Sequence, residues 1–317
     1  MGLLNFLKDS IGIDPGSQHL RIIKDGELVF NESSQISFNI SNNSISGLGD
    51  TCSSSELDVT IKPVDYAIAD FHAFEALLRG AIKKGLGSKS IFPKTYKMYY
   101  CIPTNSTQIE KRAYRDSGEH AGASEVYMIY QSYCTAVGLN LLFEKKDFIL
   151  IDFSFSKIEI TVFVDSIPIS VGVIKMGTSK IFRLFKNFLR RKYNLNISDK
   201  EVESILKGVN NVQSEIKIQS MTIKVSEIHN LLDNLFVLVN DEFMETIERV
   251  NIKDIGKVMK NGVYFSGGGS AIDFLRDKIQ IDREIKRTTS KNPMLDNING
   301  LMKIIAEKDK FRSYFIV

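Results

Sequence analysis

Two aspartates, Asp14 and Asp152, each end an apolar segment just before a turn, and a third apolar segment leads into three glycines at residues 267–269. Small residues after a strand allow backbone N–H groups to approach phosphate oxygens, because no Cβ stands in the way. A tight turn is the simpler interpretation of any one of these segments alone. The sequence therefore offers three turns at which a phosphate group could bind.

The two aspartates belong to an internal repeat. Residues 11–30 and 148–171 share one pattern: a strand ending in Ile-Asp, a short turn, a second strand, a turn that begins with Asp25 or Asp165, and a third strand. Two antiparallel units with an aspartate at the same place predict gene duplication, and so two related lobes.

Helical periodicity fills the chain between and after these strands. Apolar residues recur at helical spacing in residues 73–82 and 226–250, and two capping boxes, Thr107 with Glu110 and Ser198 with Glu201, predict helix starts. Strands that alternate with helices predict an α/β fold. The Ser- and Asn-rich residues 33–55 are typical either of a linker or of a polar, β-rich insertion.

Composition excludes several classes of function. The 317 residues suffice for two lobes, and a net charge of +3 is too small to predict a nucleic-acid partner. Three cysteines without CxxC spacing and four scattered histidines predict neither disulfides nor a metal cluster. We find no apolar run of membrane-spanning length and no secretory signal at the start, so we expect a cytoplasmic protein.

Six segments, in order along the chain, resemble motifs of the bacterial actins of the MreB type. The segment Asp14-Pro15-Gly16-Ser17 is similar to that family's Asp-x-Gly-Thr first phosphate loop, and Ser-Gly-Gly-Gly at residues 266–269 is similar to its nucleotide loop Thr-Gly-Gly-Gly. The order spans nearly the whole chain, which makes it more specific than any one loop. The other matching segments are residues 64–71, 102–113 and 122–126, and Asp152.

The resemblance implies the actin-like two-lobe fold, built from two duplicated ribonuclease-H-like domains with small, reduced extra subdomains. The expected first lobe has its core at residues 1–32 and 71–147, with an insertion subdomain at 33–70. The expected second lobe has its core at residues 148–190 and 260–317, with a small helical subdomain at 191–259.

The resemblance also implies ATP and Mg²⁺ as cofactors. Asp14 and Asp152, one from each lobe, would hold a Mg²⁺ through its water shell, because Mg²⁺ keeps waters and takes few direct carboxylates. The predicted nucleotide-binding residues come from loops in both lobes and are Asp14, Gly16, Ser17, Asp152, Ser154, Ser156, Gly177, Glu201, Gly267, Gly268, Gly269 and Ser270.

Departures from the family pattern predict a weakened site. The second phosphate loop reads Asp-Phe-Ser-Phe-Ser-Lys-Ile at residues 152–158, where the family has Asp-x-Gly-Gly-Gly-Thr-Thr. Tyr130 and Gln131 stand where the family has carboxylates that position the hydrolytic water; a glutamine can orient water but is no carboxylate base. We therefore assign no catalytic residue, although Gln131 stands at the position of the family's water-positioning glutamate, and we expect slow or absent ATP turnover.

The implied function is nucleotide-dependent, head-to-tail filament formation in cell shape, guiding wall synthesis at the inner membrane. Its partners would be further copies of the chain or a related bacterial actin. One alternative is a degenerate actin-like adaptor that binds a true filament or a membrane complex without hydrolysing ATP. A sugar-kinase-like or chaperone-like ATPase on the same fold is a third possibility.

The first residues of the chain offer a membrane hypothesis. Four apolar side chains precede the first strand, with Lys8 beside them, and could insert shallowly into a membrane interface. The alternative is that the segment packs on its own lobe or forms a frayed terminus. The four residues are Leu3, Leu4, Phe6 and Leu7.

Overall fold

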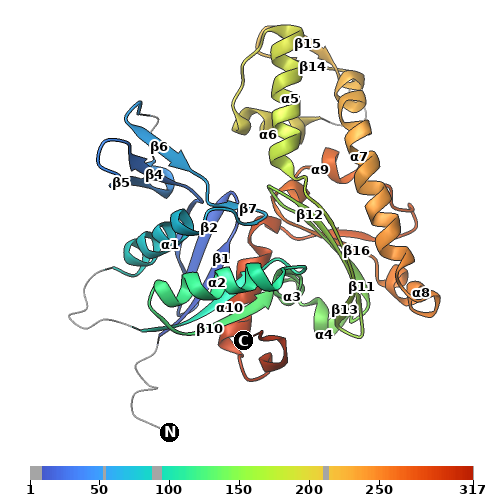
Figure 1. Ribbon diagram of the computed structural model, residues 1–317. Coiled ribbons are helices and arrows are strands. Elements are labelled where there is room, and N and C mark those ends of the chain that lie inside the picture. Colours follow the sequence, from blue (N-terminus) through green and yellow to red (C-terminus); the bar gives the residue numbers. More distant parts are fainter. Residues whose placement is uncertain (1–8, 53–54, 88–94, 210–213, 317) are drawn as a thin grey trace. The chain divides into compact units, whose positions relative to one another are not determined.

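Two five-stranded sheets form the centres of the two units into which the chain divides (Figure 1). The computed structural model describes residues 9–52, 55–87, 95–209 and 214–316. Unit 1 comprises Met1–Asn140 and Asp296–Val317, and unit 2 comprises Leu141–Leu295.

The sheet of unit 1 has the strand order β10-β9-β1-β2-β3. Its first three strands in sequence form an antiparallel meander, and β9 and β10 add on the other side of β1 in parallel. Apolar β-branched residues such as Ile11, Ile13 and Ile22 are fully buried on these strands, which suits a sheet covered on its faces. The strands are β1 (Asp9–Pro15), β2 (His19–Lys24), β3 (Glu27–Ser33), β9 (Tyr96–Ile102) and β10 (Ala123–Tyr130).

The helices of unit 1 begin where the sequence supplies caps. The Asp70 side chain accepts from the N–H of Ala73 at 2.9 Å, and the predicted capping box of Thr107 and Glu110 is confirmed at the next helix. Apolar residues at helical spacing in 73–82 face the core, as expected. The helices are α1 (Phe71–Leu86), α2 (Gln108–His120), α3 (Gln131–Gly138) and α10 (Asp296–Ala306).

Short strands occupy the polar region between β3 and α1. Its described residues form a three-stranded sheet of order β5-β4-β6 and a two-stranded pair, as the β-rich alternative predicts. The Ser37 and Thr60 hydroxyls lie 2.7 Å apart across β4 and β6. The elements are β4 (Ile36–Asn39), β5 (Ile45–Leu48), η2 (Gly49–Thr51), β6 (Asp58–Ile61), β7 (Val64–Asp65) and β8 (Ala67–Ile68).

The sheet of unit 2 repeats the arrangement of unit 1. Its order is β13-β12-β11-β16-β17, again an antiparallel meander whose first strand has a parallel neighbour on its other side. Asp14 pairs in register with Arg21, and Asp152 pairs with Glu159, so both aspartates hold the same place. The strands are β11 (Phe148–Phe153), β12 (Ile158–Val164), β13 (Ile167–Ile174), β16 (Val263–Ser266) and β17 (Arg287–Thr289).

The helices of unit 2 bury their apolar faces in a single large core. The predicted long helix at 226–250 is observed at Val225–Glu248. Ser198 and Glu201 form the second predicted capping box. The elements are α4 (Leu141–Glu144), α5 (Thr178–Tyr193), α6 (Asp199–Gly208), β14 (Glu215–Ile218), β15 (Met221–Lys224), α7 (Val225–Glu248), α8 (Ile252–Asn261), η3 (Gly268–Ala271), α9 (Asp273–Arg276) and η4 (Pro293–Leu295).

The C-terminal segment packs in unit 1, which differs from the expected second-lobe range of 260–317. Helix α10 lies against α3, where Gly138 and Gly300 allow a close approach of the two backbones. Beyond η5 (Arg312–Tyr314), Ile316 exchanges backbone hydrogen bonds of 2.8 and 2.9 Å with Met128 at the edge of β10. No helix among the described residues is long and apolar enough to cross a membrane.

Candidate functional site

The first predicted phosphate loop follows β1 directly. Asp14 is buried, and its carboxylate pairs with the Arg21 guanidinium at 3.1 Å. A Cβ at position 16 would lie 2.7 Å from the carbonyl oxygen of His19, so the turn requires glycine there. Ser17 is half-buried in the same turn. The loop is thus a tight turn, and its aspartate forms an ion pair with a basic side chain of the same unit.

Arg21 was not among the predicted site residues. Its side chain is only 8% exposed, and its Nε has no hydrogen-bond partner among the described residues. Directly opposite residues of an antiparallel pair point to the same face, which places the guanidinium beside the carboxylate of Asp14. The turn at Gly16 joins two antiparallel strands. Counting residues outward from this turn in both directions would have paired Asp14 with Arg21 from the sequence alone.

The second predicted phosphate loop is closed by its own backbone bonds. The Ser154 N–H donates to the carbonyl of Lys157 at 2.9 Å, and the Ser154 hydroxyl donates to the Asp152 carboxylate. The carbonyls of Ser154 and Phe155 accept from the N–H groups of Thr178 and Ser179 at 3.1 and 2.9 Å. The N–H groups at the start of α5 therefore hold the loop by binding the loop's carbonyl groups.

Gly177 allows the start of α5 to pack closely against this loop, because it has no side chain. A Cβ at this position would lie 2.3 Å from the carbonyl oxygen of Phe155 and 2.4 Å from that of Ser154. Gly177 therefore packs against the loop that carries Ser154 and Ser156, and its predicted nucleotide contact stays a prediction.

The two phenylalanines of this loop differ in burial. Phe153 is fully buried and meets Phe236 of α7 edge-on, with ring centroids 6.2 Å apart. Phe155 and its neighbours Ser154 and Ser156 are half-buried. Phe153 is therefore a core residue and does not block the loop.

Lys157 and Glu159 form a buried ion pair just after this loop. Their side chains are 4% and 2% exposed. Glu159 pairs in register with Asp152, so the two carboxylates lie on one face of the sheet with the Lys157 ammonium beside them. Lys157 stands where the family pattern has a threonine, and it was not among the predicted site residues.

The glycine loop after β16 lies against Asp152. Gly267 has φ +81°, and a Cβ there would lie 2.5 Å from Asp152 Oδ1, so only glycine fits. The Gly267 N–H donates to the carbonyl of Pro293 at 2.9 Å. Gly268 is half-buried, and a Cβ there would meet only the Met294 methyl group, at 3.3 Å. Gly268 is therefore the glycine of this loop with the most open surroundings.

The remaining two predicted residues of this loop, Gly269 and Ser270, are both buried. Gly269 is buried, and a Cβ there would lie 2.6 Å from the Phe153 ring. Ser270 is fully buried, and its hydroxyl donates to the carbonyl of Ser266 at 2.5 Å. Both residues therefore serve the packing of the loop.

Glu201 is exposed and bonds within its own helix cap. Its carboxylate accepts from the N–H and the hydroxyl of Ser198, both at 2.7 Å. The backbone hydrogen bond, and then the hydroxyl, lower the pKa of Glu201 below its ordinary value. The predicted nucleotide contact of Glu201 stays a prediction.

Tyr130 and Gln131 lie at the start of α3. The Lys111 ammonium donates to the Tyr130 hydroxyl at 2.9 Å and lies 5.2 Å from the centre of its ring. The Ser132 N–H donates to the Thr104 hydroxyl at 3.2 Å, and the buried Ser132 hydroxyl has no partner among the described residues. Tyr130 and Gln131 therefore supply a hydroxyl and an amide at this position, and slow ATP turnover stays a prediction.

The predicted Mg²⁺ site does not fit these surroundings well. Asp14 is matched by a guanidinium, which repels a divalent cation, and Asp152 accepts from a hydroxyl. No group of three or more His, Cys, Asp or Glu able to hold a metal occurs in the described part of the chain. The joint role of Asp14 and Asp152 involves both units and stays a prediction.

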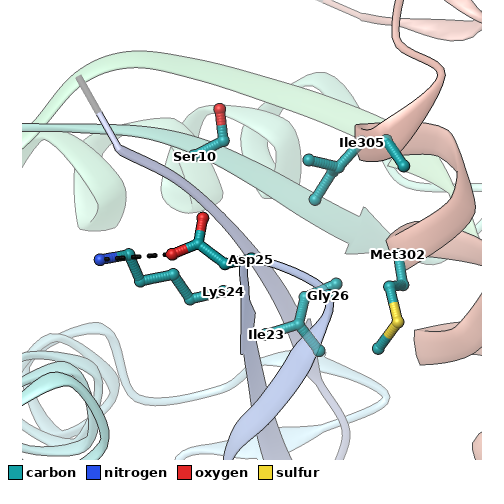
Figure 2. Close-up of a pocket in the computed structure, with 8 residues that line it drawn as sticks. Ser10, Ile23, Lys24, Asp25, Gly26, Met302 and Ile305 are labelled. Carbon is teal, nitrogen blue, oxygen red and sulfur yellow. Dashed lines mark ion pairs between the residues drawn. The ribbon is translucent and has the colours of Figure 1, made fainter. Parts of the chain in front are cut away.

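A separate pocket of about 360 Å³ lies in unit 1, at the turn between β2 and β3 beside α10 (Figure 2). It contains none of the predicted site residues. Lys24 on its wall pairs with Asp9 at 2.7 Å and with Asp25 at 3.7 Å. The pocket is lined by Ser10, Ile23, Lys24, Asp25, Gly26, Met302, Ile305 and Ala306. Leu3, Leu4, Phe6 and Leu7 lie outside the described residues.

The fold is that of the bacterial actins. It is similar to the crystal structure of MreB5 of Spiroplasma citri bound to ADP, with a TM-score of 0.82 at 20% identity over 96% of this chain and 98% of that one. It is also similar to the MamK double helical filament, with a TM-score of 0.76 at 13% identity over 94% of this chain and 99% of that one.

The sequence agrees with the fold. The chain belongs to the MreB/Mbl protein family, whose sequence model matches residues 8–313. It is 25% identical to the cell shape-determining protein Mbl of Bacillus subtilis, over 94% of this chain and 98% of that protein. It is 22% identical to the cell shape-determining protein MreB of Escherichia coli, over 74% of this chain and 72% of that protein. The resemblance seen in the sequence is thereby confirmed.

Proposed function

We propose that this chain is an actin-like cytoskeletal protein that binds an adenine nucleotide and assembles head to tail, with a role in cell shape. The observation that carries the proposal is the family match over residues 8–313, together with the two meanders whose aspartates share one register. Two of its relatives, in B. subtilis and E. coli, are named cell shape-determining proteins.

Nucleotide binding is supported by the loops and by a structural neighbour. MreB5 of S. citri has been crystallised with ADP and with AMPPNP. In this chain, Gly16 and Gly267 hold tight turns at the ends of β1 and β16, and Gly268 has open surroundings. We propose that these turns contribute backbone N–H groups to the nucleotide, whereas the closed loop at residues 154–156 contributes less.

A matched pair of glycine variants tests this binding. Gly268→Ala adds a methyl group at the open position of the loop, where only the flexible Met294 side chain must move. Gly208→Ala, at the end of α6, meets nothing within 4 Å and is the control. Calorimetry with ATP should show weaker binding only for Gly268→Ala. Equal affinity in both variants would show that this loop does not contact the nucleotide.

Head-to-tail assembly distinguishes the proposal from the adaptor alternative. A heterologous interface that does not close into a ring produces an open filament. Sedimentation and electron microscopy of the purified chain, with and without ATP, should therefore show filaments. A chain that binds nucleotide but never pellets alone, and pellets only with a related bacterial actin, would favour the adaptor, as the closed second loop also does. Turnover stimulated by a small substrate would favour a kinase-like ATPase.

We propose that these filaments bind peripherally to a membrane surface. Leu3, Leu4, Phe6 and Leu7 would each contribute roughly 1.5–3 kcal/mol if fully buried in a lipid interface. Many copies on one filament would act together, so binding should require polymerising conditions. Co-sedimentation with liposomes compares the full chain with a variant that begins at Ser10. Equal pelleting of both would remove the membrane proposal, and a lower melting temperature of the shortened chain would indicate packing on its own unit instead.

A further inference from the structure

Each of the two predicted Mg²⁺-facing aspartates lies in a group that contains a buried cation from the chain itself. In unit 1 this cation is Arg21, 3.1 Å from Asp14. In unit 2 it is Lys157, which pairs with Glu159, the register partner of Asp152. The two cations do not hold the same place: Arg21 is the register partner of Asp14, whereas Lys157 lies in the turn just before β12 and two residues before Glu159, the register partner of Asp152.

The first pair compensates the negative charge of Asp14 with the positive charge of Arg21. Both side chains are only 8% exposed, so water screens their interaction little. A guanidinium keeps its proton at every physiological pH, so the carboxylate remains neutralised. A metal ion would have to displace this cation or lie beside it.

The second group would be strongly negative without its lysine. Directly opposed residues of an antiparallel pair have Cβ atoms about 4.5–5.5 Å apart, and like charges at that distance repel. Asp152 and Glu159 are such a pair, and both are nearly fully buried. Lys157 reduces the net charge of the three groups to a single negative charge.

We infer that Arg21 neutralises Asp14 and that Lys157 offsets one of the two opposed carboxylates in unit 2, so that adenine-nucleotide binding by this chain does not require Mg²⁺ between these groups and the phosphates. The inference rests on the proposed nucleotide binding. It deepens that proposal because it assigns a role to the two basic residues near the predicted phosphate loops.

The direct test uses the unmodified full-length chain. Calorimetry measures the affinity for ATP and for ADP in saturating Mg²⁺ and again in EDTA. We expect the two affinities to agree within about threefold, a difference below 1 kcal/mol. A loss of more than about tenfold in EDTA, or 1.4 kcal/mol, would overturn the inference and leave nucleotide binding intact. Absence of binding under both conditions would overturn the proposed nucleotide binding as well.

Charge variants locate the effect. Arg21→Leu removes the guanidinium beside the Asp14 carboxylate, so the affinity of the variant for ATP should become at least about tenfold weaker in EDTA than in Mg²⁺. Because an unpaired buried charge destabilises a fold, the double variant Arg21→Leu with Asp14→Asn removes both charges and should again bind equally in both media. Lys24→Met is the control: Lys24 lies on β2, the strand that carries Arg21, and the substitution breaks its half-buried ion pair with Asp9 of β1.

The variants can also contradict the inference. Melting temperatures show which of them are folded. A folded Arg21→Leu chain that binds ATP equally well with and without Mg²⁺ would exclude the neutralising role of Arg21. The inference is supported if the single variant Arg21→Leu needs Mg²⁺ to bind ATP and the double variant binds ATP equally well with and without Mg²⁺.

Discussion

Gly300 of α10 lies directly against the backbone of Cys134 in α3: a Cβ at position 300 would be 1.6 Å from the Cys134 carbonyl oxygen. The neighbouring contact is similar, since a Cβ at Gly138 would be 2.3 Å from the carbonyl oxygen of Asp296. Two glycines thus allow the helices to pack backbone to backbone. This packing explains why the C-terminal segment joins unit 1.

Replacement of Gly300 by alanine should destabilise unit 1. Overpacking a close contact costs about 1–3 kcal/mol, and here the obstacle is backbone, which cannot rotate away. We expect a lower melting temperature by circular dichroism. Gly256→Ala, in the exposed middle of α8, meets nothing within 4 Å and should raise stability by up to about 1 kcal/mol. Equal melting temperatures for the two variants would show that α10 does not pack as described.

Glycines in the second loop should improve nucleotide binding. The variant Ser154→Gly, Phe155→Gly, Ser156→Gly removes three side chains from a half-buried turn and retains the buried Phe153. We expect higher ATP affinity by calorimetry, because backbone N–H groups could then approach phosphate. Phe153→Ala is the contrasting variant and should lower stability by about 3–5 kcal/mol. No gain in the triple variant would mean that the loop does not limit binding.

ATP turnover should be slow or absent. Gln131 supplies no carboxylate, and the Tyr130 hydroxyl accepts from Lys111. We expect phosphate release near background in a steady-state assay, and a measurable increase in Gln131→Glu. Turnover comparable to that of an ordinary bacterial actin, and abolished by Asp14→Ala, would show that another residue performs the reaction. Gln131→Ala is the matched control, since it removes the amide without adding a base.

The free energy of unfolding should decrease as the pH falls below about 6.5, the ordinary pKa of histidine. Burial, and then the nearby Arg21 charge, lower the pKa of His19 from 6.5, with Asp50 opposing them. Above about pH 6.5 the residue is neutral in both folded and unfolded chains, and its stabilising effect is complete. Below that pH the unfolded chain binds a proton that the folded chain does not, so stability is lost as the pH falls toward the lowered pKa.

A histidine variant measures this loss. Denaturant unfolding at about pH 7.5 and 5.5 should show a smaller decrease for His19→Gln than for the unmodified chain. Part of the decrease should persist, because burial and Lys278 also lower the pKa of His229. His72→Gln, on the exposed side of α1, is the control. An identical decrease in all three proteins would contradict the role of His19.

Much of the fold follows from local sequence patterns. The two meanders, the capping boxes at Thr107 and Ser198, and the long helix that ends at Glu248 are each specified by residues within a few positions of one another. The family could also be predicted, because the order of motifs along the chain is itself a property of the sequence. The boundary of the units at Asp296 was not predictable in this way, since it depends on which helix α10 packs against.

The sequence by itself determined where the candidate loops lie: Asp14, Asp152 and the glycines at 267–269 all stand at strand ends, as predicted. Only the tertiary structure decided which other segments of the chain bind or pack against the polar groups of those loops. The N–H groups at the start of α5 bind the carbonyls of the second loop, and Gly267 lies against Asp152, more than a hundred residues away in sequence. Strand ends are set by local hydrogen bonding and hydrophobic pattern, whereas the partners of a buried polar group are set by whichever distant segment packs beside it.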